Sequence, residues 1–446
     1  GYGARSRDFV NALIKIKGEE WDIKILPQRW GDTPWEFLSK DDPVRKLFIY
    51  KLTQKPDIWF QITIPSEFQA IGNFNVGVTA GIETTLFPGE FLEGMNRMNL
   101  NLVSSEHSKN VALATNYEKR EEKTQRVLGN LKLEKPCEVL FEGLNLDLYN
   151  KNPLKTDILK DISEEFCFLH TGHWLNGNFG EDRKNTATLI KTFLETFNGP
   201  GNKKPALILK VNTVNYSILD KEFILRQMNQ LNNDPKVKIF ISFTKGEGFG
   251  RPLLEGAITG KPVIVSNWSG HVDFIKPEYN ILVGGELKNV HPSAANKWLL
   301  KESQWFNIKT DVASRAIKDV FKHYKKYFKE SRKQTQYLKD NFSLNKMAEK
   351  LNSLLPSDIK ISPQHQPLKL PKLKKIIKKE QSRKQTQYIK NNWTFDSMTD
   401  KLETLLPKVE FAPQTTQLKL PKLKKVGDKK NDLPKLKLPK LKKIEA

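Results

Sequence analysis

An alternation of short apolar runs with amphipathic stretches is the feature that most constrains the fold of this 446-residue chain. It is clearest between residues 166 and 266, where the apolar runs are separated by longer stretches with helical spacing. Strands that alternate with helices in this way are typical of parallel α/β domains. The expected strands are Phe166–His170, Pro205–Val211, Val237–Ser242 and Pro262–Ser266, and the expected helices are Glu181–Phe197, Ser217–Leu231 and Pro252–Thr259. A further helix is expected over Asp311–Phe328.

The first part of the chain follows the same pattern. A helical stripe begins directly after Gly1 and Gly3, whereas in such a domain a glycine turn normally follows a strand. We therefore expect the first strand to be missing and the chain to be a fragment. Two Rossmann-like domains in tandem are predicted, at residues 1–145 and 146–328, with a ligand site in the crevice between them. The expected strands of the first are Trp21–Leu26, Ile58–Ile64, Phe74–Val78 and Leu100–Ser104, followed by a strand and turn in Pro136–Asn150.

The end of the chain contains an internal repeat. The segment Ser331–Pro356 recurs as Ser382–Pro407, and both copies begin with SRKQTQ. We expect residues 329–356 to form a helix that crosses back to pack on the first domain, and residues 382–407 to be a duplicated helix. It lies within a Lys/Pro/Leu-rich tail, residues 357–446, which holds 23 of the 74 Lys and Arg but only 9 of the 51 Asp and Glu. Because proline breaks helices and close lysines repel one another, the tail is predicted to be partly disordered.

Composition limits the class of protein. The only cysteines are Cys137 and Cys167, too few for a disulfide framework and without the clustering of a zinc site, which favours a reducing, cytoplasmic location. No signal peptide and no run of about 18 apolar residues is present, so no transmembrane segment is expected. The net charge of +23 favours anionic partners.

The most informative segment is Phe243–Ile275. Glycines at 246, 248 and 250 allow close backbone approach, and Pro252 marks the first turn of a helix, whose free N–H groups favour phosphate. Glu247 and Glu255 flank this turn. Carboxylates next to a phosphate site are unfavourable unless they accept hydrogen bonds from hydroxyls, which a sugar and a ribose supply. A surface loop with a helix-capping glutamate is the alternative interpretation.

This segment resembles the retaining glycosyltransferases of the GT-B fold, in particular glycosyltransferase family 4 (glycosyl transferases group 1). The resemblance rests on Glu-x7-Glu at Glu247 and Glu255, on TGKPVIVS and on Ser269-Gly270, and in order of elements it extends over about residues 1–355. It implies that Glu247 contacts the donor sugar's hydroxyls and that Glu255 binds the ribose. Donor-binding positions are also implied at Gly248, Phe249, Gly250 and Leu253.

The segment His170–Ile190 is similar to the family's first loop of the second domain, where a basic pair grips the donor diphosphate. Arg183 and Lys184 are the matching positions, adjacent here although the family's Arg usually stands a few residues earlier. Fixed cations at this place would stabilise the charge of a departing nucleoside diphosphate. The resemblance therefore implies catalysis without a metal ion or other cofactor. Lys210 is a second phosphate ligand or a solvated lysine at a strand end.

On the acceptor side the resemblance implies that Gly1 and Gly3 form the glycine turn near the donor diphosphate. Glu83 is a candidate polar group facing the cleft, and His107 is expected at a helix start away from the chemistry. His170 and His173 approach the donor or have a hydrogen-bonded structural role. His271 contacts the donor or caps the following helix.

Taken together, these patterns predict a retaining, metal-independent, hexosyltransferase-like enzyme. It would move a sugar from a nucleotide-diphosphate donor to an acceptor hydroxyl on a glycan, lipid, protein or nucleic acid. Three alternatives stay open: a nucleotide-sugar epimerase, a phosphorylase of the same fold, and an inactive binding protein that acts through its basic tail. The tail itself is either a solvated linker or a loose binder of an anionic surface, DNA or another protein.

Overall fold

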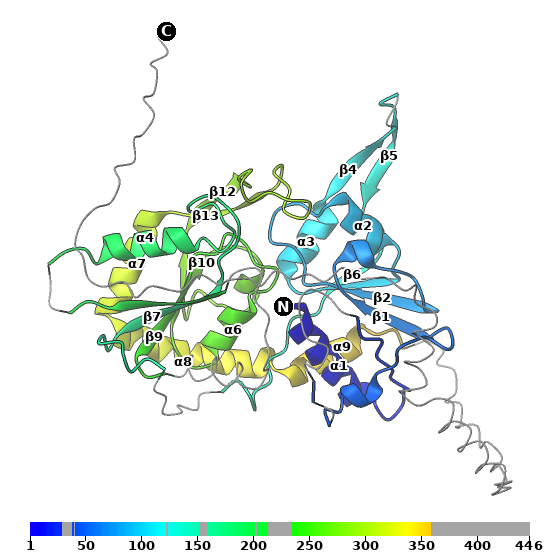
Figure 1. The fold of residues 1–446 in the computed structure, drawn as a ribbon, viewed down its shortest axis with the longest axis horizontal. Helices are drawn as coiled ribbons and strands as arrows, with labels where there is room; N and C mark the ends of the chain where they lie inside the picture. Colours follow the sequence, from blue (N-terminus) through cyan, green and yellow to red (C-terminus); the bar gives the residue numbers. More distant parts are fainter. Residues whose placement is uncertain are drawn as a thin grey trace, which may run out of the picture. The chain divides into compact units, whose positions relative to one another are not determined.

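Two separate parallel sheets organise the chain (Figure 1). The computed structural model describes residues 1–28, 38–39, 41–121, 124–150, 158–200, 203–212 and 234–357. Each sheet carries helices on both faces, which confirms the predicted α/β class with parallel sheets. We call the first sheet with its helices the N-lobe and the second sheet with its helices the C-lobe.

The N-lobe sheet has the strand order β1-β2-β3-β6, and its strands pair in parallel. Their bounds are β1 Ile58–Ile62, β2 Phe74–Val78, β3 Leu100–Val103 and β6 Cys137–Val139. Apolar side chains of α1 (Tyr2–Lys17) and α9 (Leu344–Leu354) cover one face, and those of α2 (Gly89–Asn96) and α3 (Glu106–Ala114) cover the other. The blue α1 and the yellow α9 lie side by side in Figure 1.

The C-lobe sheet has the order β11-β10-β9-β7-β8, again with parallel pairing. Its strands are β7 Cys167–His173, β8 Ala206–Asn212, β9 Val237–Ser242, β10 Val263–Ser266 and β11 Ile281–Val283. Helices α4 (Thr186–Thr196) and α7 (Thr310–Lys322) pack on one face, and α6 (Arg251–Ala257) and α8 (Tyr324–Asn341) pack on the other. The carboxyl ends of β7 and β9 lead into the two glycine-rich loops that the sequence singled out.

Two antiparallel hairpins and three short 3-10 helices complete the described elements. The hairpins are β4 (Asn116–Arg120) with β5 (Val127–Lys132), and β12 (Gly285–Asn289) with β13 (Gln304–Ile308). The 3-10 helices are η2 (Arg45–Leu47), η3 (Pro65–Glu67) and η4 (Gly270–Asp273). The sequence pattern did not predict the β4–β5 hairpin, because most of its side chains are exposed and leave no apolar alternation.

The sequence pattern predicted a strand at Trp21–Leu26, and this prediction is wrong. Within it only Ile25 forms a bridge, to Phe48. The alternating side chains Trp21 and Ile23 pack against the N-lobe core, and no described segment pairs with them as a strand. Apolar alternation alone cannot distinguish this packing from strand pairing.

The segment after residue 310 forms three helices where two were expected. The helix expected over Asp311–Phe328 ends at Lys322, His323 breaks it, and α8 follows to Asn341. Buried polar side chains of the first SRKQTQ copy fix α8 on the C-lobe: Ser331 donates to the Gly260 carbonyl, Thr335 to the Ala257 carbonyl, and Gln334 to the Phe274 carbonyl. α9 then packs against α1 of the N-lobe.

Several expectations lie outside the described residues. They are the helix Ser217–Leu231, the duplicated helix at 382–407, and the tail from residue 358 onward. Among the helices that the structure does describe, none has both the length and the apolar character to cross a membrane.

Candidate functional site

The glycine loop between β9 and α6 is pressed against the N-lobe. A Cβ atom on Gly246 would lie 1.9 Å from the carbonyl oxygen of Glu83, and one on Gly248 would lie 2.1 Å from that of Ala80. Ser104 of the N-lobe also donates to the Gly248 carbonyl at 2.9 Å. Glycine is therefore required at 246 and 248 by the close approach of the chain's own backbone. At Gly250 the backbone itself requires it, with φ +97° just before α6.

Glu247, in this loop, is the centre of an ionic cluster. Its Oε1 lies 2.5 Å from Lys184 Nζ and its Oε2 lies 3.4 Å from Arg183 Nη1. Arg183 also donates to the Gly246 carbonyl at 2.9 Å and reaches Glu83 of the N-lobe at 3.5 Å. The structure thus brings together four predicted site residues, from two segments of the C-lobe and one of the N-lobe.

The ionic partners determine the charge of Glu247. Burial by itself would raise the pKa of this carboxyl, but Lys184 and Arg183 outweigh burial and hold the pKa at about 2. For Arg183, burial lowers the pKa, and Glu83 and Glu247 more than restore it. Glu247 is therefore an anion and Arg183 a cation across the physiological range.

A buried lysine that sequence reasoning missed holds the loop that carries the basic pair. The Lys245 side chain is fully buried, pairs with Glu181 at 2.9 Å and lies 4.9 Å from the centre of the Trp305 ring. Its backbone N–H donates to the Arg183 carbonyl at 2.7 Å. No signal in the sequence distinguishes this lysine from the many exposed ones, because only the contact with Trp305 and the loop buries it.

Glu255 belongs to a second ionic cluster, around Arg251 on the first turn of α6. Arg251 contacts Glu255 at 2.8 Å, Asp8 of α1 at 2.5 Å and Glu142, after β6, at 3.5 Å. Arg5 of α1 lies 3.8 Å from Glu142. Sequence reasoning identified Glu255 but not this cluster, because its other members outside α6 come from two remote segments, α1 and the residues after β6.

The first residues form a helix and not the expected glycine turn. The Gly1 carbonyl accepts the first hydrogen bonds of α1, from the N–H groups of Ala4 and Arg5. Gly3 lies within that helix, and a Cβ there would meet only the flexible end of Arg7. Helix α1 reaches the site instead through Tyr2, whose hydroxyl lies 2.8 Å from Thr79 Oγ1 at the end of β2.

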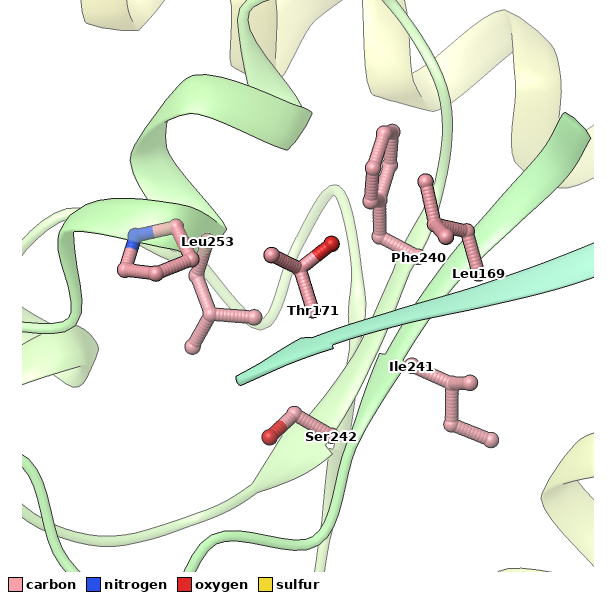
Figure 2. A pocket seen from close by; sticks show the side chains of 7 residues that line it. Leu169, Thr171, Phe240, Ile241, Ser242 and Leu253 are labelled. Carbon is pink, nitrogen blue, oxygen red and sulfur yellow. The ribbon is translucent and has the colours of Figure 1, made fainter. Parts of the chain in front are cut away.

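A small cavity lies where β7 and β9 approach the first turn of α6 (Figure 2). Leu253, an expected donor-binding position, lines it together with Thr171, whose Oγ1 is buried and has no hydrogen-bond partner among the described residues. The other lining residues are Leu169, Phe240, Ile241, Ser242 and Pro252.

Two further expected positions lie nearby. Lys210, on β8, is half-buried and pairs in register with Thr171. Phe249 packs its buried ring on Phe274, with the ring centres 4.8 Å apart, so only its backbone could face a ligand.

Two histidines of the C-lobe are buried in the site region. His170 lies 3.1 Å from the Ile241 carbonyl and, because it is buried, has a pKa of about 4. His271, on η4, is also buried and bonds to the Ser266 carbonyl through Nε2 at 2.7 Å. Both are therefore hydrogen-bonded and neutral. His173, at the end of β7, is more exposed; burial and the nearby cations lower its pKa.

His107 lies at the start of α3, as expected, but its ring contacts the C-lobe and does not point away from it. Its ring packs against that of Trp268, in the loop between β10 and η4, in a T-shaped contact with the ring centres 4.6 Å apart. Burial, together with the nearby His271, lowers its pKa to about 4. His107 therefore lies at the boundary between the lobes, because α3 presents its first turn to the C-lobe there.

No protein-family model and no curated protein matches the chain. Among solved structures, the chain is similar to a sucrose-phosphate synthase from Thermosynechococcus elongatus, with 12% identity over 63% of this chain and 66% of that one and a TM-score of 0.41. It is similar to a glycosyltransferase from Rickettsia africae ESF-5, with 15% identity over 63% and 69% and a TM-score of 0.41. A third is HepE of Anabaena in complex with UDP and glucose, with 13% identity over 67% and 77% and a TM-score of 0.45.

Proposed function

We propose that the chain is a glycosyltransferase that moves a sugar from a nucleotide-diphosphate donor to an acceptor hydroxyl. The observation that carries this proposal is the pairing of buried Glu247 with Lys184 and Arg183 where the two lobes meet. A carboxylate fixed as an anion can accept hydrogen bonds from sugar hydroxyls. Two fixed cations beside it can stabilise the charge that develops on a departing diphosphate.

The four charges of the cluster balance one another, so a diphosphate must replace one of the anions. Glu83 is the one most easily displaced, because its carboxylate is 30% exposed and lies 3.5 Å from Arg183, whereas that of Glu247 is 10% exposed and has two cationic partners. Donor binding would move Arg183 from Glu83 to a phosphate oxygen. Glu83 would then be free to accept a hydrogen bond from the incoming acceptor hydroxyl.

In the transfer step the bond between the sugar's anomeric carbon and the phosphate oxygen breaks, and a bond to the acceptor oxygen forms. The acceptor's proton passes to the departing phosphate or to Glu83. We propose that the anomeric configuration is retained, and that Arg183 and Lys184 supply the positive charge a metal ion would otherwise provide. Both features follow from the resemblance of the two loops.

The test is to incubate the protein with UDP-glucose, UDP-N-acetylglucosamine, GDP-mannose and ADP-glucose, with and without EDTA, and to measure release of the nucleoside diphosphate. Slow release that survives EDTA and falls at least about 100-fold in Glu247→Gln supports transfer. Glu195→Gln, an exposed glutamate on α4, is the matched control. Proton NMR of the first product gives the stereochemistry.

Other results would contradict the proposal. Conversion of the donor sugar without release of the diphosphate would indicate an epimerase, and turnover only with inorganic phosphate would indicate a phosphorylase. Absence of binding to every nucleotide sugar by calorimetry would leave a binding protein as the interpretation.

A further inference from the structure

His271 is buried in a single tautomer next to the ionic cluster of Glu247. It lies on η4, and its Nε2 is 2.7 Å from the Ser266 carbonyl oxygen. Because a carbonyl oxygen only accepts hydrogen bonds, Nε2 must carry the hydrogen of the ring. Burial lowers the pKa of the imidazole, so the ring is neutral and Nδ1 keeps its lone pair.

This Nδ1 atom is buried and has no hydrogen-bond partner in the part of the chain that the structure describes. An unsatisfied buried acceptor is unfavourable, and proteins rarely keep one without a use for it. The atom therefore lacks a group that donates a hydrogen bond.

The surroundings of His271 place this acceptor in the proposed donor site. A Cβ atom on Gly250 would lie 3.0 Å from the Cβ of His271 and 3.6 Å from the Cγ of Glu247, so both side chains border the same glycine. The N–H of Gly270, at the start of η4, donates to the Glu247 carbonyl at 2.9 Å. The segments that carry the His271 imidazole and the Glu247 carboxylate are therefore in direct backbone contact, which fixes the two side chains next to each other.

The facing lobe carries a second acceptor of this kind. The Nε2 atom of His107 is also buried without a partner among the described residues, while its ring bonds to the backbone of Thr84. His271 is close enough to this imidazole to contribute to the lowering of its pKa. A ligand between the lobes would therefore meet neutral acceptors beside the anion Glu247.

We propose that His271 is a specificity-determining residue of the transfer reaction, and that its Nδ1 accepts a hydrogen bond from a hydroxyl of the transferred sugar. This inference rests on the proposed function. Of the groups in a nucleotide-sugar donor, the ionised diphosphate has no hydrogen to donate, whereas every sugar hydroxyl has one. A deoxy sugar would leave Nδ1 unsatisfied and so would bind less tightly.

Two substitutions separate the acceptor from the structural hydrogen bond of His271. In His271→Gln the amide nitrogen can take the place of Nε2 and keep the bond to the Ser266 carbonyl, but the Nδ1 acceptor is lost. In His271→Asn the amide oxygen can take the place of Nδ1, and the bond to Ser266 is lost. His323→Gln, an exposed histidine paired with Asp319, is the matched control.

Calorimetry should compare the tightest-binding nucleotide sugar of the four above with its parent nucleoside diphosphate. We expect His271→Gln to weaken binding of the nucleotide sugar about tenfold and to leave that of the nucleoside diphosphate unchanged. His271→Asn should recover most of the loss. An equal loss for both ligands, or no loss, would overturn the inference, because the imidazole would then not contact the sugar.

Deoxyfluoro analogues of the same donor give a test that does not depend on a folded variant. Fluorine cannot donate a hydrogen bond, so replacing one particular hydroxyl should weaken binding to the unaltered protein about tenfold. In His271→Gln the analogue should bind as tightly as the parent donor. If the analogue still binds less tightly than the parent donor in this variant, the inference is wrong. If the unaltered protein binds none of the four nucleotide sugars, the proposed function itself is wrong. If it binds them but neither the substitutions nor the deoxyfluoro analogues change binding as expected, only the proposed role of His271 is wrong.

Discussion

Replacing Arg251 with methionine should be strongly destabilising, because it removes the shared cation of three carboxylates. Arg251 pairs with Asp8 at 2.5 Å, Glu255 at 2.8 Å and Glu142 at 3.5 Å, and the side chains of all four are no more than 15% exposed. Burial already raises the pKa of Asp8 with Arg251 in place. The substitution would leave three carboxylates in a poorly solvated place.

The magnitude follows from these distances. At an effective dielectric constant of about 20, each pair contributes about 5 kcal/mol of Coulomb attraction, most of which offsets the cost of desolvating the charges. Removing one partner of a buried pair typically costs about 3–5 kcal/mol. Because Arg5 stays 3.8 Å from Glu142, we expect a loss near the lower end, about 3 kcal/mol.

Urea unfolding of Arg251→Met at pH 7 and pH 5 measures this loss. Arg251 counteracts the rise that burial causes in the pKa of Asp8, so without this cation the pKa of Asp8 is higher and the folded variant binds more protons than its unfolded state. Its deficit relative to the unaltered protein should therefore shrink as the pH falls. The control is Arg315→Met, an exposed pair with Asp311, which should cost less than about 1 kcal/mol. A loss below about 1 kcal/mol for Arg251→Met, or an equal loss at both pH values, would refute the reasoning.

Three further outcomes are expected. The pKa of Glu247 is lowered from 4.5 to about 2, so its ionic stabilisation is present above about pH 4.5 and is lost as the pH falls toward 2; the difference in unfolding free energy between the unaltered protein and Glu247→Gln should shrink over that window. Gln334→Leu removes hydrogen bonds to Phe274 and Asn280 and should cost about 3 kcal/mol in urea unfolding, whereas the exposed Gln336→Leu should cost almost nothing. Deletion of residues 358–446 should leave release of the nucleoside diphosphate intact, and a loss of folding on deletion would place the domain boundary elsewhere.

The sequence predicted the elements whose patterns are local. The strands Phe74–Val78 and Val237–Ser242 have the predicted bounds, because apolar runs between helical stretches specify buried parallel strands. The apolar alternation at Trp21–Leu26 led to a wrong prediction. Such alternation indicates that one face of a segment packs on a core, but it does not indicate that a neighbouring strand pairs with it.

The candidate site was likewise predicted from the sequence only in part. The pattern of glycines and carboxylates selected Glu247 and Glu255, and the resemblance selected Arg183 and Lys184. The chain's own backbone, and not a ligand, fills the space beside Gly246 and Gly248, which spacing along the chain could not show.

By itself the sequence determined the α/β class, the two alternating series and the chemical identity of the groups that line the boundary between the lobes, because these depend on residues close together in the chain. Only the tertiary structure decided that Arg251 joins two remote carboxylates to Glu255, that Lys245 is buried next to the loop of the basic pair, and that His271 keeps one nitrogen unsatisfied. Charge, tautomer and hydrogen bonding depend on what surrounds a side chain in space. For Arg251 those surroundings include Asp8, more than 200 residues away in the chain, and no local pattern records that contact.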